Sequence, residues 1–126
     1  MAGERVLIVE DNEKNMKLVR DILLVLGYTP LEATSGEEAL ALAAEEAPAL
    51  VLMDIQLPDL DGAEALRRLR SDERTAGIPV LALTAQAMQG DRERFLAAGF
   101  DGYLSKPVDV DELIATVQSY CDGSAE

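Results

Sequence analysis

The chain alternates between two hydrophobic patterns along almost its whole length. Short continuous apolar runs are typical of strands that are buried on both faces of a sheet. Between them, apolar residues recur every three or four positions, as on one side of a helix. Such alternation predicts strand–helix–strand units with right-handed crossovers and a parallel sheet. The expected strands are residues 5–9, 28–32, 49–53, 78–83 and 102–104.

Capping residues mark where the expected helices begin and end. Apolar spacing from Met16 to Leu26 predicts a first helix that Gly27 ends, and Ser35 with Glu38 predicts a capping box for a second helix. Further helices are expected over residues 62–72, about 86–98 and 109–120. Together, these elements predict one α/β domain over residues 1–126, with its core at about 5–121 and a short tail at 122–126. The economical architecture is a doubly wound (βα)5 three-layer sandwich, with the flavodoxin-like strand order 2-1-3-4-5.

The composition narrows the chemistry that this domain can perform. There are 11 Lys and Arg residues, 24 Asp and Glu residues and no His, which gives a formal net charge of −13. Such an acidic surface repels nucleic acids and anionic membranes. The absence of histidine excludes Ser-His-Asp and Cys-His catalysis and HExxH zinc sites within this sequence. A single cysteine, Cys121, allows no disulfide within the chain, and no apolar run is long enough for a signal peptide or membrane span, so we expect a cytoplasmic protein.

Charged and hydroxyl side chains follow four of the expected strands. Glu10 and Asp11 follow the first strand and Asp54 follows the third. These two strands are neighbours in the predicted order, and ligand sites of such sheets lie beyond the carboxyl ends of the strands. We therefore expect the three carboxylates to converge, with Thr84 and Lys106 from the last two strands at the rim of the same cleft.

Three carboxylates at close range cannot all stay ionised without compensation. One divalent cation together with Lys106 would balance their charge. Oxygen ligands without Cys or His favour Mg²⁺, which Mn²⁺ can replace. A metal, a lysine and a threonine around Asp54 would suit a phosphoryl group, which a carboxylate can accept as an aspartyl phosphate.

Each of these residues also has a purely structural interpretation. Glu10 and Asp11 could be ordinary helix N-caps, and Asp54 could open a turn. Lys106 alone could be a solvated charge, and Pro107 could be a proline at the entry to a helix. The functional interpretation depends on their joint occurrence at one edge of one sheet.

Four segments, which span nearly the whole chain, resemble the receiver domain of two-component response regulators. They are Val-Leu-Ile-Val-Glu-Asp-Asn at 6–12, Val-Leu-Met-Asp-Ile-Gln-Leu-Pro at 51–58 with Asp-Gly at 61–62, Leu-Thr-Ala at 83–85, and Ala-Gly-Phe-Asp-Gly-Tyr-Leu-Ser-Lys-Pro at 98–107. The segments 11–18 and 87–91 are further similar to DivK-like single-domain regulators.

The resemblance implies that Asp54 accepts a phosphoryl group from a phosphohistidine on a sensor kinase or a phosphotransfer protein. It implies a Mg²⁺ site formed by Asp11, Asp54 and the backbone carbonyl of Gln56, with Glu10 acting through a water. Lys106 would pair with Asp54 and then with a phosphoryl oxygen.

The resemblance also implies a conformational switch. Thr84 would move toward the phosphoryl group and Tyr103 would follow it inward, although Tyr103 could instead be core packing. A cis peptide is implied at Lys106–Pro107. The surface over residues 86–120 would then bind an unidentified output protein, and we expect no output domain within the 126 residues.

Four other functions remain open at this point. The chain could be a phosphate shuttle or sink in a phosphorelay. A phosphatase of the haloacid dehalogenase type would need a second Asp where Gln56 stands, and a nucleotide or flavin module would need a glycine-rich loop where the sequence has Glu-Asp-Asn-Glu at 10–13. A scaffolding pseudo-receiver would lack a site residue. We expect a phosphoacceptor that catalyses only its own phosphorylation and slow autodephosphorylation.

Overall fold

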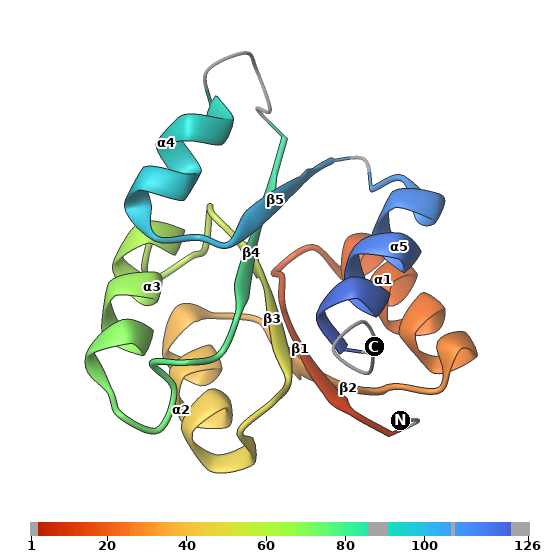
Figure 1. Ribbon diagram of the computed structural model, residues 1–126, viewed down its shortest axis with the longest axis horizontal. Helices are drawn as coiled ribbons and strands as arrows, with labels where there is room; N and C mark the ends of the chain where they lie inside the picture. Colours follow the sequence, from red (N-terminus) through yellow and green to blue (C-terminus); the bar gives the residue numbers. More distant parts are fainter. Residues whose placement is uncertain (1–2, 86–90, 107, 122–126) are drawn as a thin grey trace.

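The computed structural model describes residues 3–85, 91–106 and 108–121, and within them the chain forms a five-stranded parallel sheet (Figure 1). The strand order is β2-β1-β3-β4-β5, as predicted from the sequence. The strands are β1 (Arg5–Val9), β2 (Thr29–Ala33), β3 (Leu50–Asp54), β4 (Val80–Thr84) and β5 (Gly102–Ser105).

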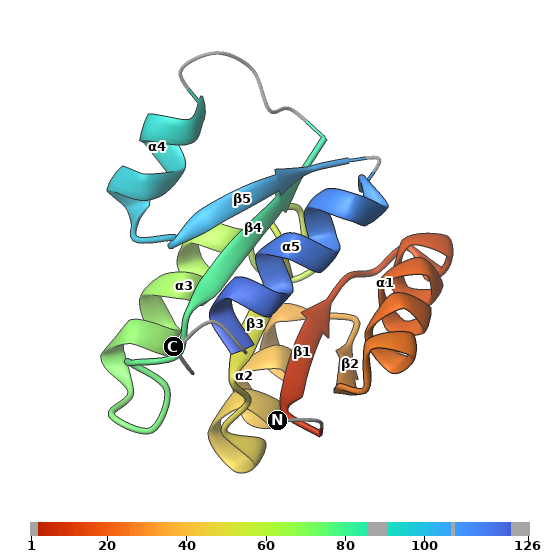
Figure 2. The same cartoon turned by 45° about the vertical axis from the view of Figure 1, so that its right-hand side comes forward.

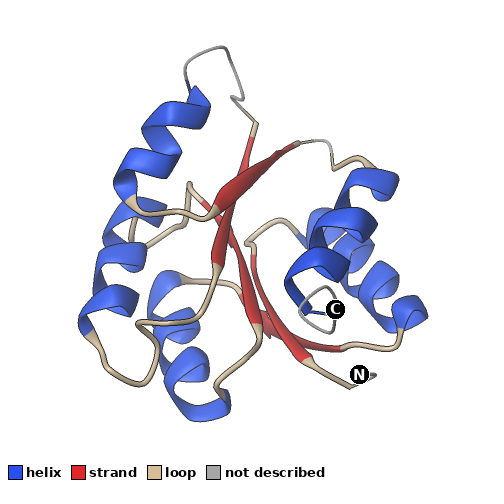
Figure 3. Cartoon of the chain, viewed as in Figure 1, coloured by secondary structure: helices blue, strands red, loops and turns tan. Residues whose placement is uncertain are grey.

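The helices cover both faces of this sheet, which makes a three-layer α/β sandwich (Figure 3). Figures 1 and 2 show α1 and α5 together on one side of the sheet, while α2, α3 and α4 lie on the other. The helices are α1 (Glu13–Leu26), α2 (Gly36–Glu46), α3 (Gly62–Ser71), α4 (Asp91–Ala98) and α5 (Val110–Cys121). The expected start of the fourth helix, near Gln86, lies outside the described residues. None of the described helices is long and apolar enough to cross a membrane.

The two faces of the sheet bury two separate hydrophobic clusters. Ile8 on β1 packs in the cluster that contains Leu23 of α1 and Leu113 of α5. Its neighbour Leu7 points to the opposite face and packs in the cluster that contains Leu66 of α3. Because successive side chains of a strand alternate between the faces, a strand covered on both sides must be apolar throughout. This explains the continuous apolar runs in the sequence.

The start of α1 resolves one of the structural interpretations. Asn12 is its N-cap, because the Asn12 side chain accepts a hydrogen bond from the Asn15 N–H at 3.1 Å. Glu10 and Asp11 precede this position, so they are not the cap. Gly27 ends the helix with φ of 92°, in the left-handed region that glycine adopts readily.

The predicted capping box of α2 is present in a shifted form. The Ser35 hydroxyl accepts a hydrogen bond from the Glu38 N–H at 3.2 Å, as expected. The Glu38 carboxylate, however, accepts from the N–H of Thr34 at 2.9 Å rather than from that of Ser35. In α5, Asp109 is the residue whose carboxylate accepts from the Glu112 N–H, so the helix begins one residue later than predicted.

Three strands extend slightly further toward the site than the apolar pattern indicated. Asp54 is the last residue of β3 and pairs with Leu83, whereas Thr84 ends β4 and pairs with Ser105. The sequence placed Asp54, Thr84 and Ser105 just after the strands. They belong to the strands because backbone pairing continues although the side chains change from apolar to polar.

Candidate functional site

Three carboxylates meet at the carboxyl ends of β1 and β3. One oxygen from each of Glu10, Asp11 and Asp54 lies within 4.8 Å of the others. Pairing of β1 with β3, in which Val9 lies opposite Met53, brings the following residues side by side. Glu10 is 1% exposed and Asp54 is 5% exposed, whereas Asp11 is exposed to solvent. The sheet thus places two buried carboxylates and one exposed carboxylate at one point.

Lys106 bridges the two buried carboxylates. Its Nζ lies 2.9 Å from Asp54 Oδ2 and 2.8 Å from Glu10 Oε1. The Lys106 N–H donates to the carbonyl of Thr84 at 2.8 Å, which fixes the backbone of Lys106 against the end of β4. Burial by itself would lower the pKa of Lys106, but the contacts with Asp54 and Glu10 outweigh it, so the pKa is raised. Lys106 therefore carries a positive charge at neutral pH.

The Glu10 carboxyl is the least exposed acid of the site. Its burial raises its pKa above the ordinary value, against the opposing effect of Lys106 and of the Asn12 N–H, which donates to Glu10 Oε2 at 3.1 Å. One lysine cannot neutralise three carboxylates, so the ionised cluster keeps a formal charge of −2. An oxygen-only cluster with this charge fits a divalent cation such as Mg²⁺.

The loop after β3 holds the backbone of Gln56 next to Asp54. The Gln56 N–H donates to Asp54 Oδ1 at 2.9 Å, and Gln56 forms an isolated antiparallel bridge with Asp61. At the end of the loop, the Gly62 N–H donates to the Ile55 carbonyl at 2.9 Å. A Cβ at Gly62 would lie 2.7 Å from Ile55 Cα, so only glycine lets the chain close here.

The other predicted residues lie at different depths. Thr84 is 1% exposed at the end of β4, beside the strand that leads to Lys106. Tyr103 is half-buried on β5 and packs against the hydrophobic cluster of the α2–α3 side. Pro107 and its predicted cis peptide lie outside the described residues.

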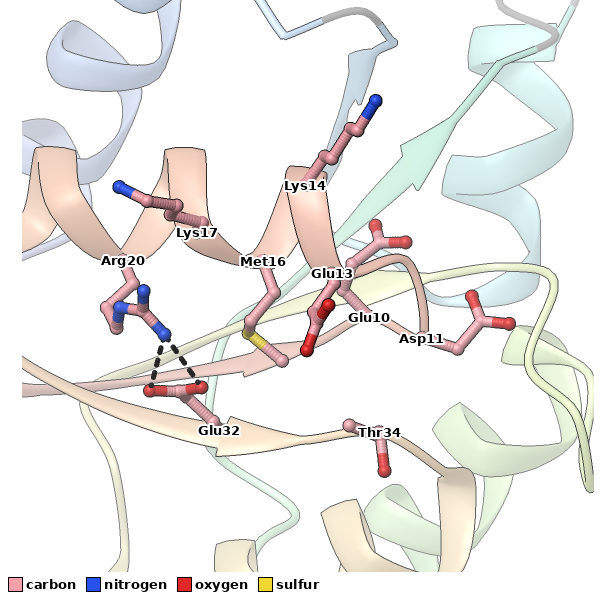
Figure 4. A pocket seen from close by; sticks show the side chains of 9 residues that line it. All are labelled: Glu10, Asp11, Glu13, Lys14, Met16, Lys17, Arg20, Glu32 and Thr34. Atoms are coloured by element: carbon pink, nitrogen blue, oxygen red, sulfur yellow. Dashed lines mark hydrogen bonds and ion pairs between the residues drawn. The ribbon is translucent and has the colours of Figure 1, made fainter.

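A surface pocket of about 410 Å³ opens beside Glu10 and Asp11, between α1 and β2. Arg20 of α1 reaches across to Glu32 of β2, with Nη1 3.3 Å from Glu32 Oε1 (Figure 4). Lys14 and Lys17 of α1 also line this pocket. The surface beside Asp11, the exposed carboxylate of the site, is therefore lined by both acidic and basic side chains.

Two residues that support the site were not identified from the sequence. Asn12 both caps α1 and holds Glu10, and its type was a usable signal because Asn is a favoured N-cap. Asp59 binds the backbone of α2. No local signal marks Asp59, because its partners lie more than 20 residues away in the sequence.

Comparison with known proteins identifies the class to which this fold and this acidic site belong. The family model of the response regulator receiver domain matches residues 6–118, so the chain belongs to this family. It is 51% identical over 115 residues to the polar-differentiation response regulator DivK of Brucella ovis, which covers 91% of this chain and 94% of that protein. DivK of Brucella anthropi is 50% identical over the same shares. The chain is thus a DivK-like receiver domain of two-component signalling.

Solved structures agree with this assignment. The receiver domain of a sensor histidine kinase from Pseudomonas aeruginosa, with a magnesium ion coordinated in its active site cleft, has a TM-score of 0.86 at 40% identity and covers 94% of this chain and 98% of its own. The receiver domain of Ssk1 of Saccharomyces cerevisiae, crystallised with the histidine phosphotransfer protein Ypd1, has a TM-score of 0.86 at 32% identity. That match covers 94% of this chain and 89% of the other.

Proposed function

We propose that this domain accepts a phosphoryl group on Asp54 and thereby changes the surface that it offers to a protein partner. The observation that carries the proposal is the environment of Asp54. This carboxylate is buried, lies 2.9 Å from the Lys106 ammonium and shares its site with two further carboxylates. A buried nucleophile next to a fixed cation suits the transfer of an anionic group.

The donor set supports a magnesium ion as the cofactor. Asp11, Asp54 and the Gln56 backbone carbonyl would hold it, with Glu10 acting through a water, and Mn²⁺ would fit the same oxygen ligands. When bound, the ion would neutralise negative charge on the incoming phosphoryl oxygens. The magnesium ion in the similar Pseudomonas aeruginosa receiver domain supports this proposal.

A phosphohistidine donor must come from outside this sequence, because the 126 residues contain no His. An oxygen of Asp54 attacks the phosphorus, the phosphorus–nitrogen bond to the imidazole breaks, and the imidazole leaves with the bonding electrons. The donor is a sensor histidine kinase or a phosphotransfer protein, as the complex of Ypd1 with the Ssk1 receiver domain supports.

The product differs from free Asp54 in charge and in the number of acceptor oxygens. Lys106 then keeps a phosphoryl oxygen as its partner, and the Thr84 hydroxyl donates to another. These interactions exist in only one of two conformations of the domain, so they shift the equilibrium toward that conformation. We place the resulting change on α4, β5 and α5, where Tyr103 would follow Thr84 inward and an output protein would bind.

Gln56 bears on how the phosphoryl group is lost. An amide side chain cannot act as a general base or acid, so we propose slow autodephosphorylation and no activity on external phosphate esters. We propose that these reactions occur in the cytoplasm.

Phosphoramidate, whose phosphorus–nitrogen bond resembles that of phosphohistidine, provides a direct test. With Mg²⁺, the wild-type protein should gain the mass of one phosphoryl group, and EDTA should prevent this. Asp54→Asn should remain unlabelled, whereas Asp72→Asn, the same change at a partly exposed carboxylate that binds Arg74, should label normally. Labelling of Asp54→Asn at another residue, or an unlabelled wild type, would refute the proposal.

A further inference from the structure

The loop that follows Asp54 is attached at its tip to the start of α2. Asp59 Oδ1 accepts a hydrogen bond from the Gly36 N–H at 2.7 Å, and Oδ2 accepts from the Glu37 N–H at 3.0 Å. These N–H groups belong to the first helical turn, where no carbonyl of the helix is available to them. The two backbone hydrogen bonds lower the pKa of Asp59, so the carboxylate is ionised at neutral pH.

Close packing accompanies these hydrogen bonds. A Cβ at Gly36 would lie 2.7 Å from Leu60 Cδ1 and 3.0 Å from Leu60 Cβ. The loop tip and the helix start therefore touch without room for another methyl group. Leu60 also packs against the hydrophobic cluster on this side of the sheet, so its position depends on the core as well as on the loop.

The two segments that Asp59 joins are each hydrogen-bonded to one of the strand ends that carry the acidic site. On one side, the loop runs back to Gln56, whose N–H donates to Asp54. On the other side, α2 follows β2, and the last residue of β2, Ala33, accepts a hydrogen bond from the Glu10 N–H at 3.0 Å. Asp59 therefore closes a ring that includes Gln56, Asp54, Glu10 and the start of α2.

We propose that Asp59 is a positioning residue of the metal site: it fixes the loop that carries the Gln56 carbonyl relative to the strand end that carries Glu10 and Asp11. This inference rests on the proposed function, because it assigns Asp59 to the same magnesium site. A loop held in place before the ion binds loses less conformational freedom on binding. Asp59 itself would not touch the ion.

A simpler explanation is that Asp59 only stabilises α2 as a helix cap. The structure offers a control for this, because Ser35 caps the same helix through the Glu38 N–H at 3.2 Å and makes no part of the loop attachment described above. Ser35→Ala should therefore weaken the helix start while the bonds from Asp59 remain. A second control, Asp59→Asn, removes the charge but keeps one acceptor oxygen.

The test is calorimetric titration of Mg²⁺ into the full chain. Asp59→Ala should weaken Mg²⁺ binding by about tenfold, the lower end of the effects seen for groups that orient metal ligands. Asp59→Asn should lose clearly less than Asp59→Ala, and Ser35→Ala should bind as the wild type does. In EDTA, amide hydrogen exchange over residues 55–61 should be faster in Asp59→Ala than in Ser35→Ala.

Three results would overturn the inference. They are unchanged Mg²⁺ affinity in Asp59→Ala, an equal loss in Ser35→Ala, and an equal loss in Asp59→Asn. The second would assign the effect to helix stability and the third to charge alone. Failure of the wild type to bind Mg²⁺ would instead refute the proposed function and the metal role with it, whereas the exchange experiment would still report on the loop attachment.

Discussion

Replacement of Lys106 by methionine tests the electrostatic account of the site most directly. The substitution keeps a long apolar side chain but removes the only positive charge found next to Glu10 and Asp54 among the described residues. At an effective dielectric constant of about 20, each contact of 2.8 to 2.9 Å corresponds to about 6 kcal/mol of attraction before desolvation is subtracted. Without Lys106, the carboxylates remain within 4.8 Å of one another, where the same dielectric gives at least about 3.5 kcal/mol of repulsion per pair.

The net loss of stability is smaller than these gross energies, because water solvates the charges to different extents in the folded and the unfolded protein. Removing one partner of a buried ion pair destabilises proteins by about 3–5 kcal/mol. The Lys106 side chain is 16% exposed, so we expect the lower end, about 3 kcal/mol, for Lys106→Met. Lys17→Met is the matched control: the Lys17–Asp21 pair has a similar distance of 2.7 Å, but both side chains are exposed, so we expect a much smaller loss of stability than in Lys106→Met.

The pH dependence of this loss provides a second check. The pKa of Glu10 is already raised by burial, and losing Lys106 raises it further. The folded variant then binds a proton that the unfolded chain lacks, so its stability increases as the pH falls. The loss in Lys106→Met should therefore be smaller at pH 5.5 than at pH 7.5, as judged relative to the wild type. In the wild type, the raised pKa of Lys106 stabilises the fold throughout this range, and this contribution is lost only in alkaline solution.

The assay is urea unfolding followed by circular dichroism, with EDTA present because a bound divalent cation would replace the missing charge. A pH of 5.5 stays above the sequence pI of about 4.2. The reasoning would be refuted by a loss below 1 kcal/mol at pH 7.5, or by a loss that does not shrink at pH 5.5.

Two further substitutions probe the same region. Glu10→Gln should increase the free energy of unfolding in EDTA at pH 7.5, because burial and the nearby Asp54 disfavour the ionised Glu10 carboxylate, and Lys106 keeps Asp54 as its partner. The same substitution should weaken Mg²⁺ binding, and reduced stability in urea would contradict this reasoning. Gly62→Ala should destabilise the fold by about 1–3 kcal/mol, because its Cβ would lie 2.7 Å from Ile55 Cα. Gly77→Ala is the control and should be nearly neutral in the same urea unfolding experiment, because nothing lies within 4 Å of its Cβ. Equal effects of the two substitutions would show that the loop can move aside.

The architecture was predictable because its causes are local or topological. Strand β3 is buried at all five positions, and its apolar run from Leu50 to Met53 signals this directly. The end of α1 is also signalled locally, because Gly27 readily adopts the left-handed backbone conformation found there. The prediction stopped one residue short at Asp54, because a strand continues as long as its backbone pairs, and hydrophobicity does not record that pairing.

The membership of the site was predictable for a different reason. Once strands 1 and 3 are taken as neighbours, Glu10, Asp11 and Asp54 must approach one another at the same sheet edge. Which helix cap was used could not be settled in this way. Asp11 and Asn12 are both favoured cap types, and only the structure shows that Asn12 accepts the hydrogen bond from the Asn15 N–H.

The sequence by itself determined a parallel α/β domain and the set of polar residues that follow its strands, because apolar periodicity and chain connectivity suffice for these. The strand order came from the usual arrangement of doubly wound sheets. Only the tertiary structure decided that Lys106 is shared between Glu10 and Asp54, that Glu10 is buried and Asp11 exposed, and that Asp59 attaches the loop to α2. These contacts join residues that are distant in the sequence. They depend on side-chain direction and on the removal of water, which follow from the packing of the whole domain.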